Sequence, residues 1–205
     1  MIKDYSLWPS MSEDFKDSHS IRMDVKVLTT SMWPVENSSI SNSKLADAFS
    51  WINQFSDFYS KRHSGRKLSF LSRLGTMQLS LVLDNGKFDI QAPTLLGLLL
   101  LSFNDNIELS HEDAASLLDI SHQEACDILE YLTNDINLLL KTDNIFTLNT
   151  SFKAKASKVQ LQLPSSLSKR SIEPKPAQSQ ADKSYLYPFY FNFCFSLLHL
   201  RLMLV

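Results

Sequence analysis

The chain has 205 residues, of which 44% are hydrophobic and 20% are charged, and its formal net charge is −2. These values are typical of a globular protein with one or two small domains, and they argue against a disordered chain. Because the net charge is close to zero, no overall field attracts the chain to nucleic acid or to acidic membranes.

The first twenty residues are polar, rich in serine and acidic side chains, and too short to fold alone. They contain no apolar segment of the kind that a secretory signal requires. The two cysteines, Cys126 and Cys194, lie far apart in the sequence, which favours free thiols in a reducing compartment. We therefore expect a protein of the cytoplasm, the nucleus or both.

The first predicted elements are a strand and a helix. Residues 22–29 alternate between apolar and polar side chains, with Val25 and Val27 on the apolar side, which predicts a strand with one buried face. Residues 44–64 then have apolar side chains at intervals of three and four, which predicts an amphipathic helix that ends at Gly65. The apolar stripe of this helix consists of Leu45, Ala48, Phe49, Ile52, Phe55 and Tyr59.

A β-hairpin is the next predicted element. Residues 76–83 alternate, with Leu79 and Leu81 on the apolar side, and the Asn85-Gly86 pair favours a tight turn into a return strand over residues 87–91. Residues 94–103 follow as an almost entirely apolar helix. This helix is too short to span a bilayer, so we expect it to be buried.

Residues 104–163 continue with two short helices, a hairpin and a strand. The pattern Ser-x-x-Asp at 110–113 and the pattern Ser-x-x-Glu at 121–124 are capping boxes that each begin a helix. Residues 137–149 predict a small hairpin, so the order of elements is that of a winged helix. A final strand over residues 158–163, with Val159 and Leu161, stops at Pro164.

The last forty residues differ in composition from the rest. Residues 165–184 form a linker rich in Pro, Ser, Lys and Gln with nothing to bury. Residues 185–205 are abruptly apolar and long enough to span a membrane, but polar residues and a proline within them raise the cost of insertion. We expect a tail of unknown role without a fold of its own, and a membrane anchor is the weaker alternative.

These elements predict an α+β fold with a small mixed or antiparallel sheet, one amphipathic helix, a winged-helix module and a disordered C-terminal tail. The predicted units are residues 1–20, 21–92, 93–164, 165–184 and 185–205.

A winged helix suggests nucleic-acid binding, in which the second helix of the turn motif enters the major groove. Here the exposed positions of that helix are expected to carry Glu124, Asp127 and Glu130, without any lysine or arginine. Carboxylates repel phosphates, which basic side chains must neutralise for binding. A protein-docking role is therefore favoured, and a winged-helix nucleic-acid-binding protein is the rival hypothesis.

Catalytic and metal-binding patterns are weak. His122 and Cys126 lie four residues apart, as two zinc ligands could, but no second pair has ligand spacing. The sequence contains no nucleophile elbow and no glycine-rich phosphate loop. We expect no catalytic residue, no metal and no cofactor.

A basic cluster follows the amphipathic helix, in the segment KRHSGRKL, and consists of Lys61, Arg62, Arg66 and Lys67. One interpretation is a solvated helix exit in which one or two arginines bond loop carbonyls. The other is a patch that faces a protein partner. Four or five cations in an otherwise acidic chain are a weak footprint for nucleic acid.

Several segments resemble the cullin family. The segment FYSKRHSGRKLSFLSRLGTMQLSL is similar to the cullin pattern F-Y-x-x-x-H-S-G-R-K-L that leads into a hairpin. MIKDYSLWPSMSEDFKDS resembles the last helix of the cullin four-helix bundle, and DVKVLTTSMWP resembles the strand that ends in Trp-Pro. APTLLGLLLLSFND and IFTLNTSFKAKASKVQLQLP are similar to the beginning and the end of the first winged helix. The resemblance covers about residues 1–164.

The resemblance implies a scaffold fragment of a RING-type ubiquitin ligase, acting in ubiquitin-dependent protein degradation without catalysis of its own. In the family a small RING-finger protein adds its N-terminal strand to the cullin sheet. The expected docking positions here are Val25, Val27, Leu79, Leu81, Val159 and Leu161. The basic patch would face the RING protein or a conjugating enzyme (E2), and neither nucleic acid nor a membrane is an expected partner.

Two parts of the family pattern have no counterpart in this sequence. No segment resembles the helical repeats that bind substrate adaptors, and none resembles the second winged helix, so we assign no acceptor lysine for a ubiquitin-like modifier. A non-functional truncated scaffold is therefore a further alternative. In that case the stripe that contains Ile52 and Phe55 would have lost part of its cover.

Overall fold

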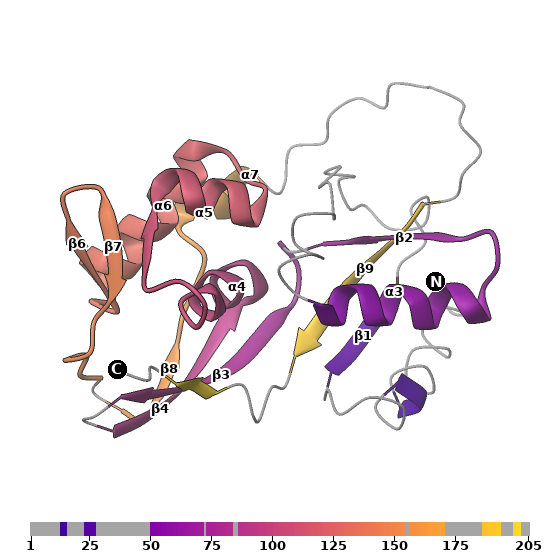
Figure 1. The fold of residues 1–205 in the computed structure, drawn as a ribbon, viewed down its shortest axis with the longest axis horizontal. Helices are drawn as coiled ribbons and strands as arrows, with labels where there is room; N and C mark the ends of the chain where they lie inside the picture. The colour runs from indigo at the N-terminus through magenta and orange to yellow at the C-terminus, as the bar shows by residue number, and fades with distance from the viewer. Residues whose placement is uncertain are drawn as a thin grey trace.

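The computed structural model describes residues 13–15, 23–27, 50–71, 73–83, 86–154, 156–170, 186–193 and 199–201. The predictions for the first twelve residues, for residues 28–49 and for most of the linker lie outside these ranges. The described residues form an α+β fold with one large and one small sheet, as the sequence predicts (Figure 1).

The large sheet has seven strands within the described residues. Five of them follow one another in the order β1-β9-β3-β4-β8, and the remaining two lie off this path, since β2 pairs with β9 and β10 pairs with β3. The four strands predicted for this sheet are present as β1, β3, β4 and β8, although β8 ends at Gln160 rather than at residue 163. The seven strands are β1 (Met23–Val27), β2 (Lys67–Phe70), β3 (Thr76–Leu83), β4 (Gly86–Pro93), β8 (Lys158–Gln160), β9 (Leu186–Phe193) and β10 (His199–Arg201).

The β3–β4 hairpin confirms the clearest pattern in the sequence. Its strands are antiparallel and pair without interruption from Thr76 opposite Pro93 to Leu83 opposite Gly86. The alternating residues of β3 are buried, because one face of the hairpin lies on the core. Gly86 has a φ of +147°, which a residue with a side chain rarely adopts, so the turn requires glycine here.

The predicted amphipathic helix is α3 (Ser50–Arg62). The described members of its apolar stripe, Ile52, Phe55 and Tyr59, are buried. Phe15 from the described N-terminal residues packs edge-on against Phe55 and Phe58, with centroid distances of 5.4 and 5.2 Å. Ile52 and Phe55 are 2% and 0% exposed. For these two residues the expected loss of cover is therefore wrong, because the sheet and Phe15 cover them.

The structure corrects one prediction after the helix. The sequence predicted that the whole basic segment is an exit loop, whereas residues 67–70 form β2. Phe70 is buried and lies edge-on to Trp51 of α3 at 5.8 Å. Burial of this aromatic ring and pairing with β9 stabilise β2. The strand has only four residues, too few for an alternation of apolar and polar side chains to be recognised in the sequence.

The winged-helix elements appear in the predicted order. They are α4 (Thr94–Ser102), β5 (Glu108–Ser110), α5 (His111–Leu118), α6 (His122–Glu130), a π-helical turn over Tyr131–Asp135, β6 (Leu139–Thr142) and β7 (Ile145–Leu148). Strands β5, β7 and β6 form the small sheet, in that order. The sequence did not predict β5, since three residues with one apolar side chain give no period.

Both capping boxes are present in the structure. The Ser110 hydroxyl accepts from the Asp113 N–H while the Asp113 carboxylate accepts from the Ser110 N–H, and Ser121 and Glu124 form the same pair at α6. Every residue of α4 is buried. This helix lies over β3 and β4 and joins the winged helix to the large sheet (Figure 1).

The C-terminal region differs from the prediction. Residues 165–170, expected in the linker, form the short helix α7 (Ser165–Arg170), in which Leu167 is buried. The described parts of the apolar tail are the paired strands β9 and β10, where the sequence predicted a disordered tail. Aromatic residues favour strands, and pairing with β1, β2 and β3 supplies hydrogen bonds that the tail alone lacks. No helix within the described residues has the length and apolar character to cross a bilayer.

The contact between α4 and β3 gives a testable prediction. A Cβ added at Gly97 would lie 2.7 Å from Met77 Sδ and 3.0 Å from Met77 Cβ. We expect Gly97→Val to lower the free energy of unfolding by about 2 kcal/mol, because the added atoms force two close-packed elements apart. Urea unfolding followed by circular dichroism measures the change.

Ser116→Val, at an exposed position of α5, is the matched control for Gly97→Val. It adds a β-branched side chain to a helix without a steric clash, so its effect should stay within about 1 kcal/mol. Equal losses in the two variants would contradict the close packing of α4 on β3.

Candidate docking site

A position for one strand lies near the middle of the large sheet, between β1 on one side and β2 and the start of β3 on the other. We call this position the strand slot. It is occupied by β9, which runs antiparallel to β1 and parallel to β2 and β3. Figure 1 shows β9 passing between β1 and β2 beside α3.

The strand slot offers backbone pairing along eight residues. Residues 189–193 pair with β1, residues 186–189 pair with β2, and Asn192 and Phe193 pair with Thr76 and Met77 of β3. Backbone N–H and C=O groups at such positions require partners, so a strand in the slot satisfies groups on both of its sides.

The six docking residues expected from the sequence lie in or beside strands of the large sheet. Five of them are buried, and Val159 is half-buried against the core. Their side chains therefore support the sheet from inside, and what these strands present to another strand is backbone. The docking role of Val25, Val27, Leu79, Leu81, Val159 and Leu161 stays a prediction.

The basic patch of Lys61, Arg62, Arg66 and Lys67 lies at the end of α3 and the start of β2, next to one end of the strand slot. Lys67 is the register partner of Leu186. Arg62 pairs with Asp14 and stacks over the Phe58 ring at 4.5 Å. Arg66 donates to Tyr59 Oη at 3.3 Å. Arg62 and Arg66 thus contact a carboxylate, an aromatic ring and a phenol.

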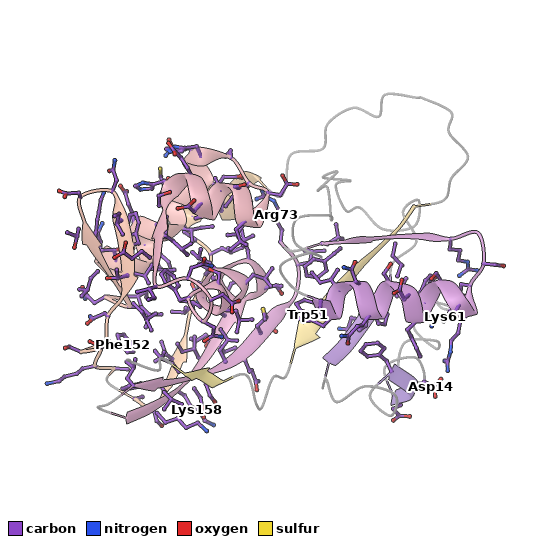
Figure 2. All side chains as sticks on the ribbon, viewed as in Figure 1. Asp14, Trp51, Lys61, Arg73, Phe152 and Lys158 are labelled. Carbon is purple, nitrogen blue, oxygen red and sulfur yellow. The ribbon has the colours of Figure 1, made fainter. Side chains whose placement is uncertain are left out.

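His63 adds no charge to the basic patch at neutral pH. Partial burial, and then the charges of Arg66 and Arg62, lower the pKa of the imidazole below its usual value. Its ring lies 4.6 Å from the Tyr59 ring, so it extends the aromatic packing of α3. Lys61 is exposed at the surface end of the helix (Figure 2).

An ion pair connects the border of the strand slot to the winged helix. Arg73, which Figure 2 labels, lies in the connection between β2 and β3 and donates to Glu124 Oε1 of α6 at 2.8 Å. Glu124 is 6% exposed, so the expectation that it faces solvent on the recognition helix is wrong. Asp127 is half-buried and Glu130 is exposed on that helix.

The Glu124 carboxyl is held in its charged form. Burial alone raises its pKa, but the hydrogen bonds from Arg73 and Ser121 and the charge of Arg73 outweigh burial, so the pKa lies below its ordinary value. A buried carboxylate with these partners acts as a structural tie and not as an acid or base.

The His122–Cys126 pair has the geometry of a weak contact. Cys126 Sγ lies 3.5 Å from His122 Nδ1. Burial, and then the charges of Glu130 and Asp127, raise the pKa of the Cys126 thiol, which keeps it protonated and a poor ligand or nucleophile. Within the described ranges, no group of three or more His, Cys, Asp or Glu side chains could hold a metal ion.

A shallow groove of about 540 Å³ lies over the polar face of β3, β4 and β8. Ser80 Oγ donates to Asp89 Oδ1 at 3.0 Å within it. This serine has a carboxylate partner rather than a histidine base, so the groove offers no activated nucleophile. The strand slot is the candidate functional site.

Comparisons with known proteins agree with these elements. The profile of the cullin alpha+beta domain matches residues 27–171. The chain is 26% identical to Cullin-1 of Oryza sativa subsp. japonica over 166 residues, which covers 74% of this chain and 22% of that protein. It is 27% identical to Cullin-4A of Homo sapiens over 177 residues, covering 78% of this chain and 23% of that protein. The chain thus spans less than a quarter of the length of these relatives.

The Arg73–Glu124 tie predicts a pH-dependent stability. Because the folded-state pKa of Glu124 is lowered, its contribution is complete above the model-compound value of 4.5 and is lost as the pH falls through the folded pKa. We expect Glu124→Gln to lower the free energy of unfolding at pH 7 by about 1–3 kcal/mol, and the difference from the native chain to shrink below pH 4.5. Urea unfolding at both pH values measures it.

Glu112→Gln, at an exposed position of α5, is the control for Glu124→Gln. It changes the same kind of side chain at a position on the surface, so we expect a small effect at either pH. A loss for Glu124→Gln that is as large at acidic pH as at pH 7 would contradict a charged Glu124 in the folded state.

Proposed function

Because the chain belongs to the cullin family, we propose that it acts as a non-catalytic scaffold in a RING-type ubiquitin ligase and that its large sheet docks a small RING-finger protein. The chain performs no chemistry in this proposal. It holds the RING protein, and through it a conjugating enzyme, in the cytoplasm or the nucleus.

The strand slot is the observation that supports docking. Strand addition requires a sheet in which one position can be filled by an extended segment that pairs with its neighbours through backbone hydrogen bonds. The slot accepts such a segment, since an eight-residue strand lies in it with β1 on one side and β2 and β3 on the other. The resemblance to cullins implies that the N-terminal strand of a RING protein takes this kind of position.

The basic patch supports a protein partner at the same end of the sheet. Lys61, Arg62, Arg66 and Lys67 precede or open β2, which borders the slot. Asp14 compensates part of this charge. A partner strand that enters the slot would bring acidic groups of the RING protein or of the conjugating enzyme near these cations, where they accelerate association.

Co-elution tests the proposal. We expect the full chain, co-expressed with a small RING-finger protein, to elute with it as a one-to-one complex on size exclusion. Lys26→Pro should abolish co-elution, because proline disrupts the strand pairing of β1, which borders the slot. Gln160→Pro changes β8, the strand at the opposite end of the described sheet, and should leave the complex intact.

The outcomes separate the alternatives. Absence of a complex both with the native chain and with Tyr190→Pro, in which proline interrupts β9, would overturn RING docking. Loss of the complex with Gln160→Pro but not with Lys26→Pro would move docking to the β8 edge. A chain that aggregates without a partner would support the truncated, non-functional alternative, and salt-sensitive retention of DNA would support the nucleic-acid rival.

A further inference from the structure

The strand in the slot comes from the apolar tail of the same chain. Within the described residues, every residue of β1 and every residue of β2 has its strand partner in β9. The tail also covers β3 on the side away from β4, at Thr76 and Met77 through β9 and at residues 80–82 through β10. The tail thus pairs with each of the strands that border the slot.

A second strand cannot share the slot with β9. Each backbone N–H and C=O of a strand points to one neighbour, so the groups of β1 that pair with residues 189–193 are not available to another chain. The side chains of Val25 and Val27 are buried when β9 is in place, so another strand has no access to β1 from the core side of the sheet. A partner strand must therefore displace β9.

The sequence of β9 makes it an imperfect occupant. The segment LYPFYFNF is rich in aromatic residues that favour strands. However, Pro188 is the register partner of Ser69 in β2, and proline has no N–H to donate. A partner strand without proline would keep a backbone donor at this position, which β9 lacks.

We propose that β9 is an exchangeable, autoinhibitory strand: it closes the slot when the chain is alone, and it leaves when the extended strand of a partner protein enters. The inference rests on the proposed function, which identifies the partner as the N-terminal strand of a RING-finger protein. The occupying strand should be an extended segment with apolar side chains at alternate positions, as the buried face of the sheet requires.

The exchange has a measurable consequence for affinity. A tethered strand competes at a high effective concentration, and the apparent affinity for the partner falls in proportion to the fraction of molecules with an open slot. Residues 171–185 connect α7 to β9, and fifteen residues can span up to about 50 Å, so the length of the linker does not prevent the tail from leaving the slot.

A disulfide lock tests whether β9 occupies the slot. In a full-length chain with Cys126→Ser and Cys194→Ser, we place Lys26→Cys opposite Tyr190→Cys, which are register partners. Opposite residues of antiparallel strands have Cα atoms within the range that a disulfide spans. The matched control, Lys26→Cys with Phe191→Cys, puts the thiols on opposite faces of the sheet. We expect only the first pair to form a cross-link under mild oxidation. The inference would be overturned if the first pair formed no cross-link, or if both pairs cross-linked equally.

Binding of a purified RING-finger protein to the locked chain tests the exchange. We expect the oxidised chain to bind at least about tenfold more weakly than the reduced chain, with reduction restoring affinity, and the control pair to bind equally in both states. Equal binding by the oxidised and reduced lock would overturn the exchange while leaving RING docking in place. If the oxidised lock, the reduced lock and the tail variant Tyr190→Pro all fail to bind the RING-finger protein, RING docking and the exchange are both overturned, whatever the cross-linking result.

Discussion

The arrangement of the large sheet depends on the backbone pairing of β9. This strand connects β1 and β2, which lie with α3 on one side of the molecule, to β3, which lies with the winged helix on the other (Figure 1). The Arg73–Glu124 ion pair and the hairpin packing under α4 hold the second group together without β9. The first group has its described strand pairs only through β9.

This difference between the two groups explains why the strand slot is the candidate site. The winged helix is complete, because α5 and α6 begin with capping boxes, the small sheet is paired and every residue of α4 is buried. The α3 side has a well-packed aromatic core, with Phe15, Phe55 and Trp51 in edge-on contacts, but its sheet requires one strand from elsewhere. An exposed strand edge invites pairing with another chain, and a strand that fills the slot removes this hazard.

Elements with a strong local period could be predicted from the sequence, and those that depend on distant partners could not. The β3–β4 hairpin and both capping boxes are encoded within a few residues, so their prediction is confirmed. Strand β2 is too short, and β9 is stabilised by strands more than 100 residues away in sequence. The capping role of Glu124 could be predicted from the sequence. Its ion pair with Arg73 could not, because Arg73 lies 51 residues earlier in the chain. The alternating aromatic residues of the tail were the available signal for β9. The predicted docking residues lie in or beside strands of the large sheet, but sequence cannot identify the position in this sheet that another strand fills.

Hydrogen exchange of the backbone amides of β1 and β2 tests most directly whether β9 holds these strands in the sheet. The native chain is compared with Tyr190→Pro, which removes a donor from the middle of β9, and the β3–β4 hairpin serves as the internal reference. We predict that residues 23–27 and 67–70 exchange at least about tenfold faster in the variant, because their opening free energy falls, while the hairpin is unchanged. Equal protection of β1 and β2 in both chains would contradict the central role of β9.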